Sequence, residues 1–200
     1  MGFAVKSVPF PPISEQDYFD IDAASALKHE FVNGEVYAMA GATERHNTIA
    51  GNFFVRLHTA PGRGSCRPFM GDMRLRLARG SAYYYPDVLL VCDPLDVDPI
   101  VKTSPCLVAE VTSISTEATD RREKLAAYLA MPSLREYLIL SHLEARVDLY
   151  QRHDESEGQW RYSCLRGDDA FALSCLPLTL SVAEIFAGVT FDPVNEDAPR

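Results

Sequence analysis

The stretches Tyr85–Val91 (YPDVLLV) and Leu107–Val111 (LVAEV) decide how this sequence folds. Both are short and almost entirely apolar, and proline or polar residues flank them, as is typical of strands in the middle of a sheet. Each stretch carries one carboxylate: Asp87 lies near the start of the first, and Glu110 lies inside the second. The sequence therefore predicts two neighbouring buried strands, each with an acidic side chain.

These two carboxylates need a positive partner. An ionised carboxylate among leucine and valine side chains loses several kcal/mol of hydration unless a positive group compensates it. Two such groups on neighbouring strands also repel each other unless a cation lies between them. Asp87 and Glu110 therefore predict a site for a divalent metal ion.

The length and composition fit one domain. The chain has 200 residues, of which 47% are hydrophobic, and this is ample for a core. No apolar run reaches the ~18 residues of a membrane span, and residues 1–12 lack the apolar core of a signal peptide. We expect a cytoplasmic protein with an extended arm over residues 1–13, a single domain over 14–190 and a flexible acidic tail over 191–200.

The five cysteines are odd in number and widely spaced, and no C-x-x-C pair occurs. This pattern favours neither a zinc site nor a disulfide framework. Cys92 and Cys106 lie in or beside the expected buried strands, where cysteine behaves as a small apolar residue. We therefore expect the cysteines to contribute to packing.

The charge is acidic overall but uneven. A net charge of -9 argues against a protein that coats nucleic acid without specificity. The segment Arg56–Arg79, however, contains six arginines and one acid, Asp72. A basic stripe of this kind suits contacts to phosphate, with Arg74 and Arg76 as candidates for nucleic-acid binding. Ordinary solvated arginines on edge strands explain the pattern equally well.

Local signals place the first elements. Asn33-Gly34 lies between two alternating apolar runs within Lys28–Met39, which predicts a hairpin with a type I′ turn. Ser14 with Asp17, and Ser181 with Glu184, have the spacing of capping boxes that begin short helices. The residues after Thr43, up to about Thr59, have the apolar periodicity of a helix.

The order of the remaining elements predicts the fold class. After Glu110 we expect a helix from about Glu117 to Ala130, and then strands at Glu136–Ser141, Arg146–Arg152 and Trp160–Leu165. A helix between two buried strands makes a crossover that leaves the strands parallel. The sequence thus predicts an α/β fold, with a central mixed β-sheet flanked by helices and an N-terminal β-hairpin.

Lys124 completes a candidate catalytic constellation with Asp87 and Glu110. Two carboxylates can hold one or two Mg²⁺ ions through oxygen ligands, and the backbone carbonyl of Val111 could add another. The metal lowers the pKa of a bound water and offsets charge on a phosphate, while a lysine nearby can orient the nucleophile or neutralise the phosphate. Lys124 also lies four residues after Asp120, which is the spacing of a routine ion pair on a helix surface.

Three further residues are supporting candidates. Glu30 lies on a strand of the expected hairpin. Asp72 shares a strand face with two arginines, so an Arg–Asp pair explains it as well as a role in the site does. His46 lies on the apolar face of its helix, where it either belongs to the core or faces the site.

A set of short motifs carries a resemblance to a known family over about Ser14–Tyr150. These motifs are Lys28–Glu30, Val32–Glu35, Arg45–Asn47, Asp72–Arg76, Tyr85–Val88, Glu110-Val111 with Ser113 and Ser115, Asp120, Lys124, Tyr128 and Pro132–Tyr137. Together they resemble the Uma-two family, whose members are restriction-endonuclease-like proteins of the PD-(D/E)XK nuclease superfamily.

The resemblance implies a restriction-endonuclease-like core with a Mg²⁺-dependent phosphodiesterase centre, in which Mn²⁺ could substitute. Asp87 matches the aspartate that follows proline in the superfamily motif, and Glu110 matches its second acid. Thr112 stands where the motif has lysine, so Lys124 on the following helix is the candidate for that role. DNA is the implied substrate, and cutting both strands with one site per chain would favour a homodimer.

Two alternatives stay open. The chain could be a catalytically inactive nuclease-like module for binding or dimerisation, which Thr112 and the acidic pI favour. It could also be a metal-dependent hydrolase of small phosphoesters. The sequence has no Gly-rich phosphate loop, nucleophile elbow or dinucleotide-binding fingerprint, which argues against kinases, serine hydrolases and dehydrogenases.

Overall fold

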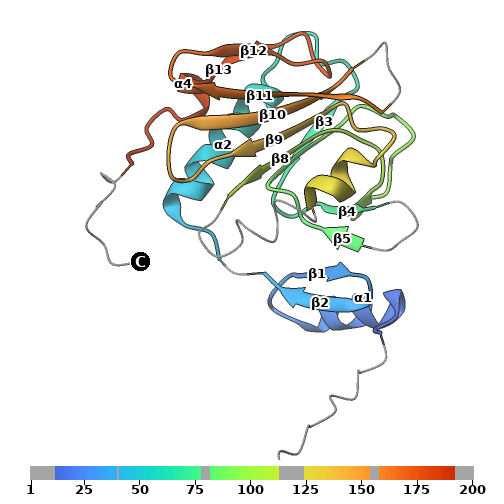
Figure 1. Cartoon of the computed structure of the whole chain (residues 1–200). Helices are drawn as coiled ribbons and strands as arrows, with labels where there is room; N and C mark the ends of the chain where they lie inside the picture. The colour runs from blue at the N-terminus through green and yellow to red at the C-terminus, as the bar shows by residue number, and fades with distance from the viewer. Residues whose placement is uncertain (1–11, 40, 78–81, 113–123, 154–157, 192–200) are drawn as a thin grey trace, which may run out of the picture.

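The computed structural model describes residues 12–39, 41–77, 82–112, 124–153 and 158–191 (Figure 1). Residues 124–129 are helical. The other elements are α1 (Glu15–Ala24), β1 (His29–Val32), β2 (Glu35–Ala38), α2 (Glu44–His58), β3 (Arg67–Met70), β4 (Arg74–Arg76), β5 (Ala82–Tyr84), β6 (Val88–Val91), β7 (Val101–Lys102), β8 (Pro105–Val111), β9 (Glu136–Leu140), β10 (Arg146–Arg152), β11 (Trp160–Arg166), β12 (Ala170–Ala172), β13 (Thr179–Ser181) and α4 (Val182–Ile185).

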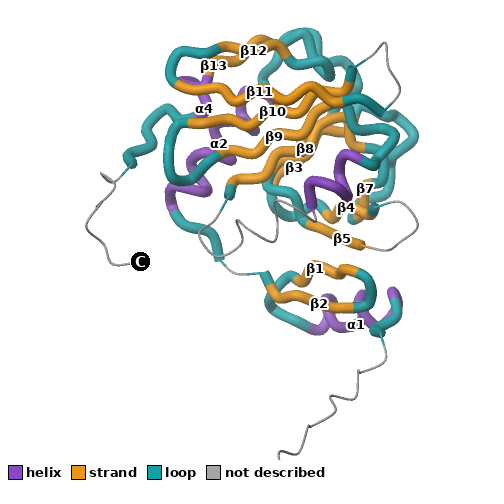
Figure 2. Tube along the Cα trace, viewed as in Figure 1, coloured by secondary structure: helices purple, strands orange, loops and turns teal. Residues whose placement is uncertain are grey.

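The strands form three sheets, which Figure 2 shows in orange. The largest has six strands in the order β11-β10-β9-β8-β6-β3, the second has five in the order β2-β1-β5-β4-β7, and β12 pairs with β13. In the six-stranded sheet β8 and β9 are parallel, while the other neighbours are antiparallel. The helix at residues 124–129 lies between β8 and β9 in the chain. The expected mixed α/β fold and its crossover are therefore confirmed.

Two hydrophobic clusters cover the two faces of the six-stranded sheet. Along β6, Val88 and Leu90 belong to the cluster that contains α2, β12, β13 and α4. The alternate residues Leu89 and Val91 belong to the cluster that contains β4, β5 and the helix at 124–129. Because successive side chains of a strand point to opposite faces, β6 needs apolar residues at every position. This explains its continuous apolar sequence.

The N-terminal elements follow their local signals. Asn33 and Gly34 have φ angles of 50° and 91°, as the predicted type I′ turn requires. Ser14 and Asp17 form both hydrogen bonds of the predicted capping box, and α1 continues to Ala24. Tyr18 on α1 packs with Phe31 and Tyr83, and this third cluster joins α1 to the hairpin β1–β2 and to β5.

Other expectations need amendment. Asp72 was expected on a strand with two arginines, but the strand there, β4, is short and begins only at Arg74. The hairpin β12–β13, which had no clear sequence signal, covers part of the sheet. The expected arm, most of the tail and the first part of the helix predicted from Glu117 lie outside the described residues. Among the residues that the structure describes, no helix is both long and apolar enough to cross a membrane.

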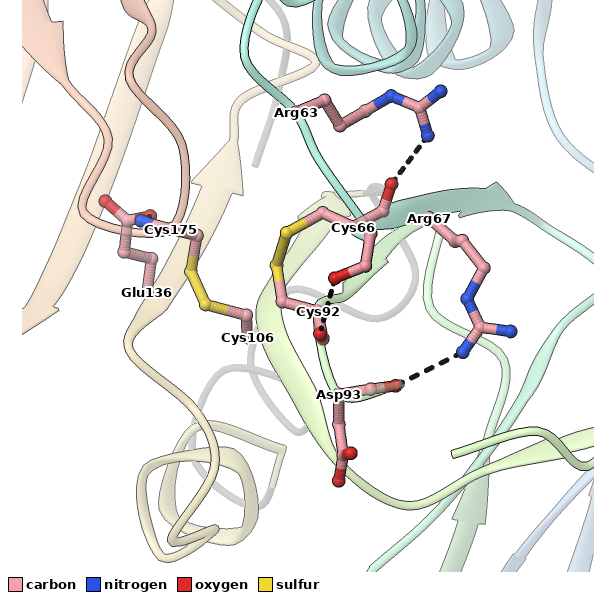
Figure 3. The surroundings of a disulfide bond; sticks show 9 residues. Arg63, Cys66, Arg67, Cys92, Asp93, Cys106, Glu136 and Cys175 are labelled. Atoms are coloured by element: carbon pink, nitrogen blue, oxygen red, sulfur yellow. Dashed lines mark hydrogen bonds between the residues drawn. A yellow bond between two sulfur atoms is a disulfide. The ribbon is translucent and has the colours of Figure 1, made fainter. Parts of the chain in front are cut away.

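The expectation that the cysteines form no disulfides is wrong. Cys66 is bonded to Cys92, and Cys106 is bonded to Cys175 (Figure 3). The first bridge follows from the register of β3 and β6, which pairs Arg67 with Val91 and so brings the preceding and following cysteines opposite each other. This register is a tertiary property, and the spacing of cysteines along the sequence does not contain it.

Both disulfides lie at one end of the two strands that carry the acidic residues. Cys92 directly follows β6, and Cys106 is near the start of β8. Asp87 and Glu110 lie at the opposite ends of these antiparallel strands. The bridges thus fasten the far ends of the strands that position the two carboxylates. Disulfides are typical of oxidising compartments, so the cytoplasmic location expected from the sequence stays a prediction.

Replacing Cys106 and Cys175 with alanine is expected to lower the free energy of unfolding by about 4 kcal/mol, because a cross-link that closes a long loop restricts the unfolded chain. The bridge spans 69 residues of sequence. Urea denaturation followed by circular dichroism measures the effect. Cys164→Ala is the matched control, because Cys164 is free and exposed. A double variant as stable as the wild type would contradict the expectation.

Candidate active site

Asp87 and Glu110 lie directly opposite each other on neighbouring strands. β6 and β8 pair Val88 with Ala109, and one further step along the same register pairs Asp87 with Glu110. Both side chains project from the face that the helix at residues 124–129 covers, since Asp87 is two residues from Leu89 and Glu110 is two residues from Val108, which both belong to the cluster on that face. The backbone N–H of Asp87 lies 3.4 Å from Oε2 of Glu110. The sheet therefore holds the two predicted acids together, as expected.

Asp87 is fixed through both carboxylate oxygens. The His46 ring nitrogen Nε2 lies 2.8 Å from Oδ1, and the backbone N–H of Val111 donates to Oδ2 at 2.7 Å. His46 reaches the carboxylate from the first turn of α2, where Thr43 caps the helix. His46 therefore faces the site instead of joining the buried face of its helix. Val111 contributes its N–H to Asp87, a contact that the sequence did not predict.

Glu110 receives its contacts from the helix at residues 124–129. The Tyr128 hydroxyl donates to Oε1 at 2.7 Å, and Nζ of Lys124 lies 3.6 Å from the same oxygen. Lys124 and Tyr128 are four residues apart, so they share one face of the helix. Tyr128 is completely buried. The crossover helix thus supplies the positive group that the sequence assigned to Lys124.

Lys124 also joins the N-terminal hairpin to the site. Its ammonium group donates to Oε1 of Glu30 on β1 at 2.8 Å, and it lies 5.1 Å from the centre of the Tyr84 ring. The side chains of Lys124, Glu30 and Glu110 are only 12–14% exposed. Asp120, with which Lys124 has the spacing of a surface ion pair, lies outside the described residues. Glu30 is therefore one of the supporting candidates that the fold brings into the site.

The surroundings of the site shift the pKa values of two side chains, Glu110 and His46. Burial raises the pKa of Glu110 to about 7, together with the carboxylates of Asp87 and Glu30, although Lys124 and the Tyr128 hydrogen bond act in the opposite direction. Burial opposes a charge on His46, but its hydrogen bond to Asp87 and the nearby negative charges raise its pKa above 6.5. Among the described residues, the carboxylates of Glu30, Asp87 and Glu110 thus surround the ammonium group of Lys124 and the ring of His46.

The carboxylates of Asp87 and Glu110 are of the kind that binds a divalent cation. Carboxylate oxygens are the ligands that Mg²⁺ prefers, and the raised pKa of Glu110 reflects first its burial and then the proximity of the other carboxylates. Over the described ranges of the chain, no three His, Cys, Asp or Glu side chains form a ready metal-binding group. Two protein carboxylates with water and phosphate oxygens would match the habit of Mg²⁺, which keeps several waters and takes few protein ligands.

Asp72 and the arginines have other partners. Asp72 forms an ion pair with Lys28 instead of with an arginine. Arg74 forms an ion pair with Asp22 and donates to the Tyr85 hydroxyl. Arg76 interacts with the Tyr83 hydroxyl. The remaining arginines of the supposed stripe also contact protein groups: Arg56 pairs with Glu184, Arg63 donates to the carbonyl of Cys66, and Arg67 donates to those of Asp93 and Asp96, while Arg79 lies outside the described residues.

Thr112, which stands where the motif of the resembled superfamily has lysine, contacts another side chain of the protein. The hydroxyl of Thr112 lies 3.0 Å from Nδ1 of His142, and it accepts a hydrogen bond from the His142 backbone at 3.3 Å. Both side chains are buried. Thr112 therefore joins the ends of β8 and β9. Tyr128, in contrast, is a site residue to which the sequence assigned no role, and its spacing of four from Lys124 was the available signal.

The fold is that of a nuclease-like protein. The structure matches a crystal structure from Anabaena variabilis, described as a putative nuclease belonging to DUF820, with a TM-score of 0.71 and 16% identity, over 88% of this chain and 98% of that one. At this identity the likeness concerns the fold alone. The chain belongs to the Uma2 family, described as "Putative restriction endonuclease", whose model matches residues 15–183.

Two relatives come from Synechocystis sp. The uncharacterized protein slr1290 is 33% identical over 186 residues, which cover 92% of this chain and 97% of the relative. The uncharacterized protein sll1609 is 32% identical over 161 residues, which cover 79% and 90%. The family match extends beyond Tyr150, where the resemblance in the sequence ended, and so includes β11 to β13.

The raised pKa of Glu110 predicts a pH dependence of stability. A folded-state pKa of about 7, against 4.5 ordinarily, means that the folded state binds the proton more tightly. The contribution of Glu110 to the free energy of unfolding is therefore fully present below pH 4.5 and is lost as the pH rises to about 7. At about 1.4 kcal/mol per pKa unit, the loss is on the order of 3 kcal/mol.

Urea unfolding of the wild type and of Glu110→Gln at pH 5 and pH 8 measures this effect. The wild type should lose more stability between the two pH values than the variant does, since glutamine does not titrate. The variant also serves as the control for all other titrating groups. An identical loss in both proteins would contradict a raised pKa at Glu110.

Proposed function

We propose that this chain is a Mg²⁺-dependent endonuclease that hydrolyses DNA phosphodiester bonds. The observation that carries the proposal is the juxtaposition of Asp87 and Glu110, two mostly buried carboxylates opposite each other on paired strands. The arrangement costs free energy through desolvation and through repulsion between like charges. A bound divalent cation would remove both costs. The Uma2 family and the nuclease-like fold support the same reaction class, since restriction-endonuclease-like proteins generally use divalent metals.

Asp87 and Glu110 are the proposed metal ligands, with Mn²⁺ able to replace Mg²⁺. The cation would lower the pKa of a water molecule and offset negative charge on the phosphate. Oε2 of Glu110 is the more available oxygen for this role, because Tyr128 and Lys124 both contact Oε1, whereas Oε2 has a long contact of 3.4 Å with the Asp87 N–H. The carbonyl of Val111 stays a candidate ligand, and its N–H already holds Asp87 in place.

The remaining polar residues of the site have proposed roles in handling charge. Lys124 lies between Glu30 and Glu110, and its ammonium group can turn towards a phosphate oxygen or towards the attacking water. Glu30 would then orient Lys124. His46 holds Asp87 through Oδ1, and it is placed to accept or donate a proton at the edge of the site.

DNA is the proposed substrate and a two-fold homodimer the proposed active form. One such centre cuts one strand, so a dimer with two centres would cut both. Arg74 is less suited to binding phosphate than the sequence suggested, because it is committed to Asp22 and Tyr85, whereas Arg76 is exposed and stays a candidate. The proposed contact to DNA therefore rests on the metal centre and Lys124.

The proposal is tested by isothermal titration calorimetry with Mn²⁺ and by cleavage of supercoiled plasmid DNA with Mg²⁺. Asp87→Asn and Glu110→Gln should each weaken Mn²⁺ binding at least about tenfold and abolish cleavage, since each removes a charged ligand. Lys124→Met should bind Mn²⁺ and cleave far more slowly. Metal removal with EDTA should stop cleavage by the wild type.

Asp148→Asn is the matched control, because Asp148 is a buried carboxylate of the same sheet that accepts a hydrogen bond from Tyr162, on β11. It should change neither Mn²⁺ binding nor cleavage. Wild-type protein that binds no Mn²⁺ in the presence of DNA would contradict the metal centre. It would then favour the inactive nuclease-like module for binding or dimerisation.

A further inference from the structure

The helix at residues 124–129 brings two different groups to one oxygen of Glu110. The Tyr128 hydroxyl donates to Oε1 at 2.7 Å, a normal hydrogen-bond distance, whereas Nζ of Lys124 lies 3.6 Å away. Lys124 makes its shorter contact, at 2.8 Å, with Glu30. Of these two groups, only Tyr128 hydrogen-bonds Glu110.

The second oxygen of Glu110 is held much less firmly. Oε2 has a contact of 3.4 Å with the backbone N–H of Asp87, which is long for a hydrogen bond. This contact places Oε2 towards Asp87, on the side where the two carboxylates meet. The hydrogen bond from Tyr128 to Oε1 therefore leaves Oε2 on the side of Asp87, where a cation held by both carboxylates would lie.

The Tyr128 ring is itself fixed by its surroundings. It is completely buried, and its centre lies 5.7 Å from that of Tyr84 and 5.1 Å from that of Tyr137. A buried hydroxyl without a partner is costly, and Glu110 is the partner seen here. The packing of the ring thus determines where the hydroxyl points, and the hydroxyl in turn determines the orientation of the carboxylate.

We propose that Tyr128 is a positioning residue of the metal centre, which orients Glu110 so that Oε2 faces the cation. The inference rests on the proposed function, since it assigns a role within the same site. A residue that only packs would act through its ring, and phenylalanine would replace it fully. A positioning residue acts through its hydroxyl, as do the outer-shell partners that hold metal-binding carboxylates.

The test compares Tyr128→Phe with Tyr137→Phe. Tyr137 is the matched control, because it is a buried neighbour in the same group of rings. Calorimetric titration should show Mn²⁺ binding weakened roughly tenfold or more in Tyr128→Phe, the range for loss of an outer-shell partner, and unchanged in Tyr137→Phe. Plasmid cleavage by Tyr128→Phe should recover at high Mn²⁺ concentration, since the loss is one of metal affinity.

The possible outcomes separate the two proposals. If the wild type and Tyr128→Phe bind Mn²⁺ equally, the role of Tyr128 is overturned and the proposed function stands. If the wild type binds no Mn²⁺, the proposed function fails and the role of Tyr128 fails with it. Equal weakening in both tyrosine variants would assign the effect to packing and would also overturn the role.

A double-mutant cycle covers the case in which Tyr128→Phe is strongly destabilised. Urea midpoints are measured for Tyr128→Phe, Glu110→Ala and the double variant, at a pH where Glu110 is ionised in the wild type. The substitution at Tyr128 should shift the midpoint less when Glu110 is already replaced, because the two side chains share the interaction. Additive shifts would mean that the hydroxyl does not act on Glu110, and would overturn the proposal.

Discussion

Two like charges that face each other across a pair of strands are the constraint on which the rest of the site depends. Asp87 and Glu110 are adjacent because the register of β6 and β8 brings Asp87, the residue just before β6, opposite Glu110 on β8. Burial first, and the repulsion from Asp87 second, raise the pKa of Glu110 to about 7. The surrounding contacts can be understood as the means by which the fold tolerates this pair.

The fold tolerates it by supplying donors from several elements. α2 contributes His46, the end of β8 contributes a backbone N–H, and the crossover helix contributes Lys124 and Tyr128. These elements are far apart in the chain, and the topology of the sheet brings them to one end of the two strands. At the other end, the disulfides of Cys92 and Cys106 hold the same strands to their neighbours.

Much of this was predictable from local patterns. The apolar runs gave the two central strands, Asn33-Gly34 gave the hairpin turn, and the acid of each run gave the two carboxylates that lie close together. These predictions succeeded because each depends on residues close together in the sequence. The parallel pairing of β8 and β9 followed from the expected crossover helix, which is again a local signal.

The rest depends on contacts between distant residues. The bridge from Cys66 to Cys92 requires the register of β3 and β6, and the pairing of Arg74 with Asp22 requires α1 to lie against β4. A count of arginines along the chain therefore did not predict the protein groups that they contact, and the phosphate-binding surface stays a prediction. His46 shows the same limit, since helical periodicity placed it on the buried face and only the tertiary structure shows it at Asp87.

Anomalous X-ray diffraction from crystals soaked in Mn²⁺ would test the central claim most directly. If Asp87 and Glu110 form a metal centre, an anomalous peak should lie within coordination distance of both carboxylates, with Oε2 of Glu110 turned towards it. A peak elsewhere, or none, with His46 still hydrogen-bonded to Asp87, would contradict that claim. The fold would then hold two opposed carboxylates without a cation, and the nuclease assignment would lose its chemical basis.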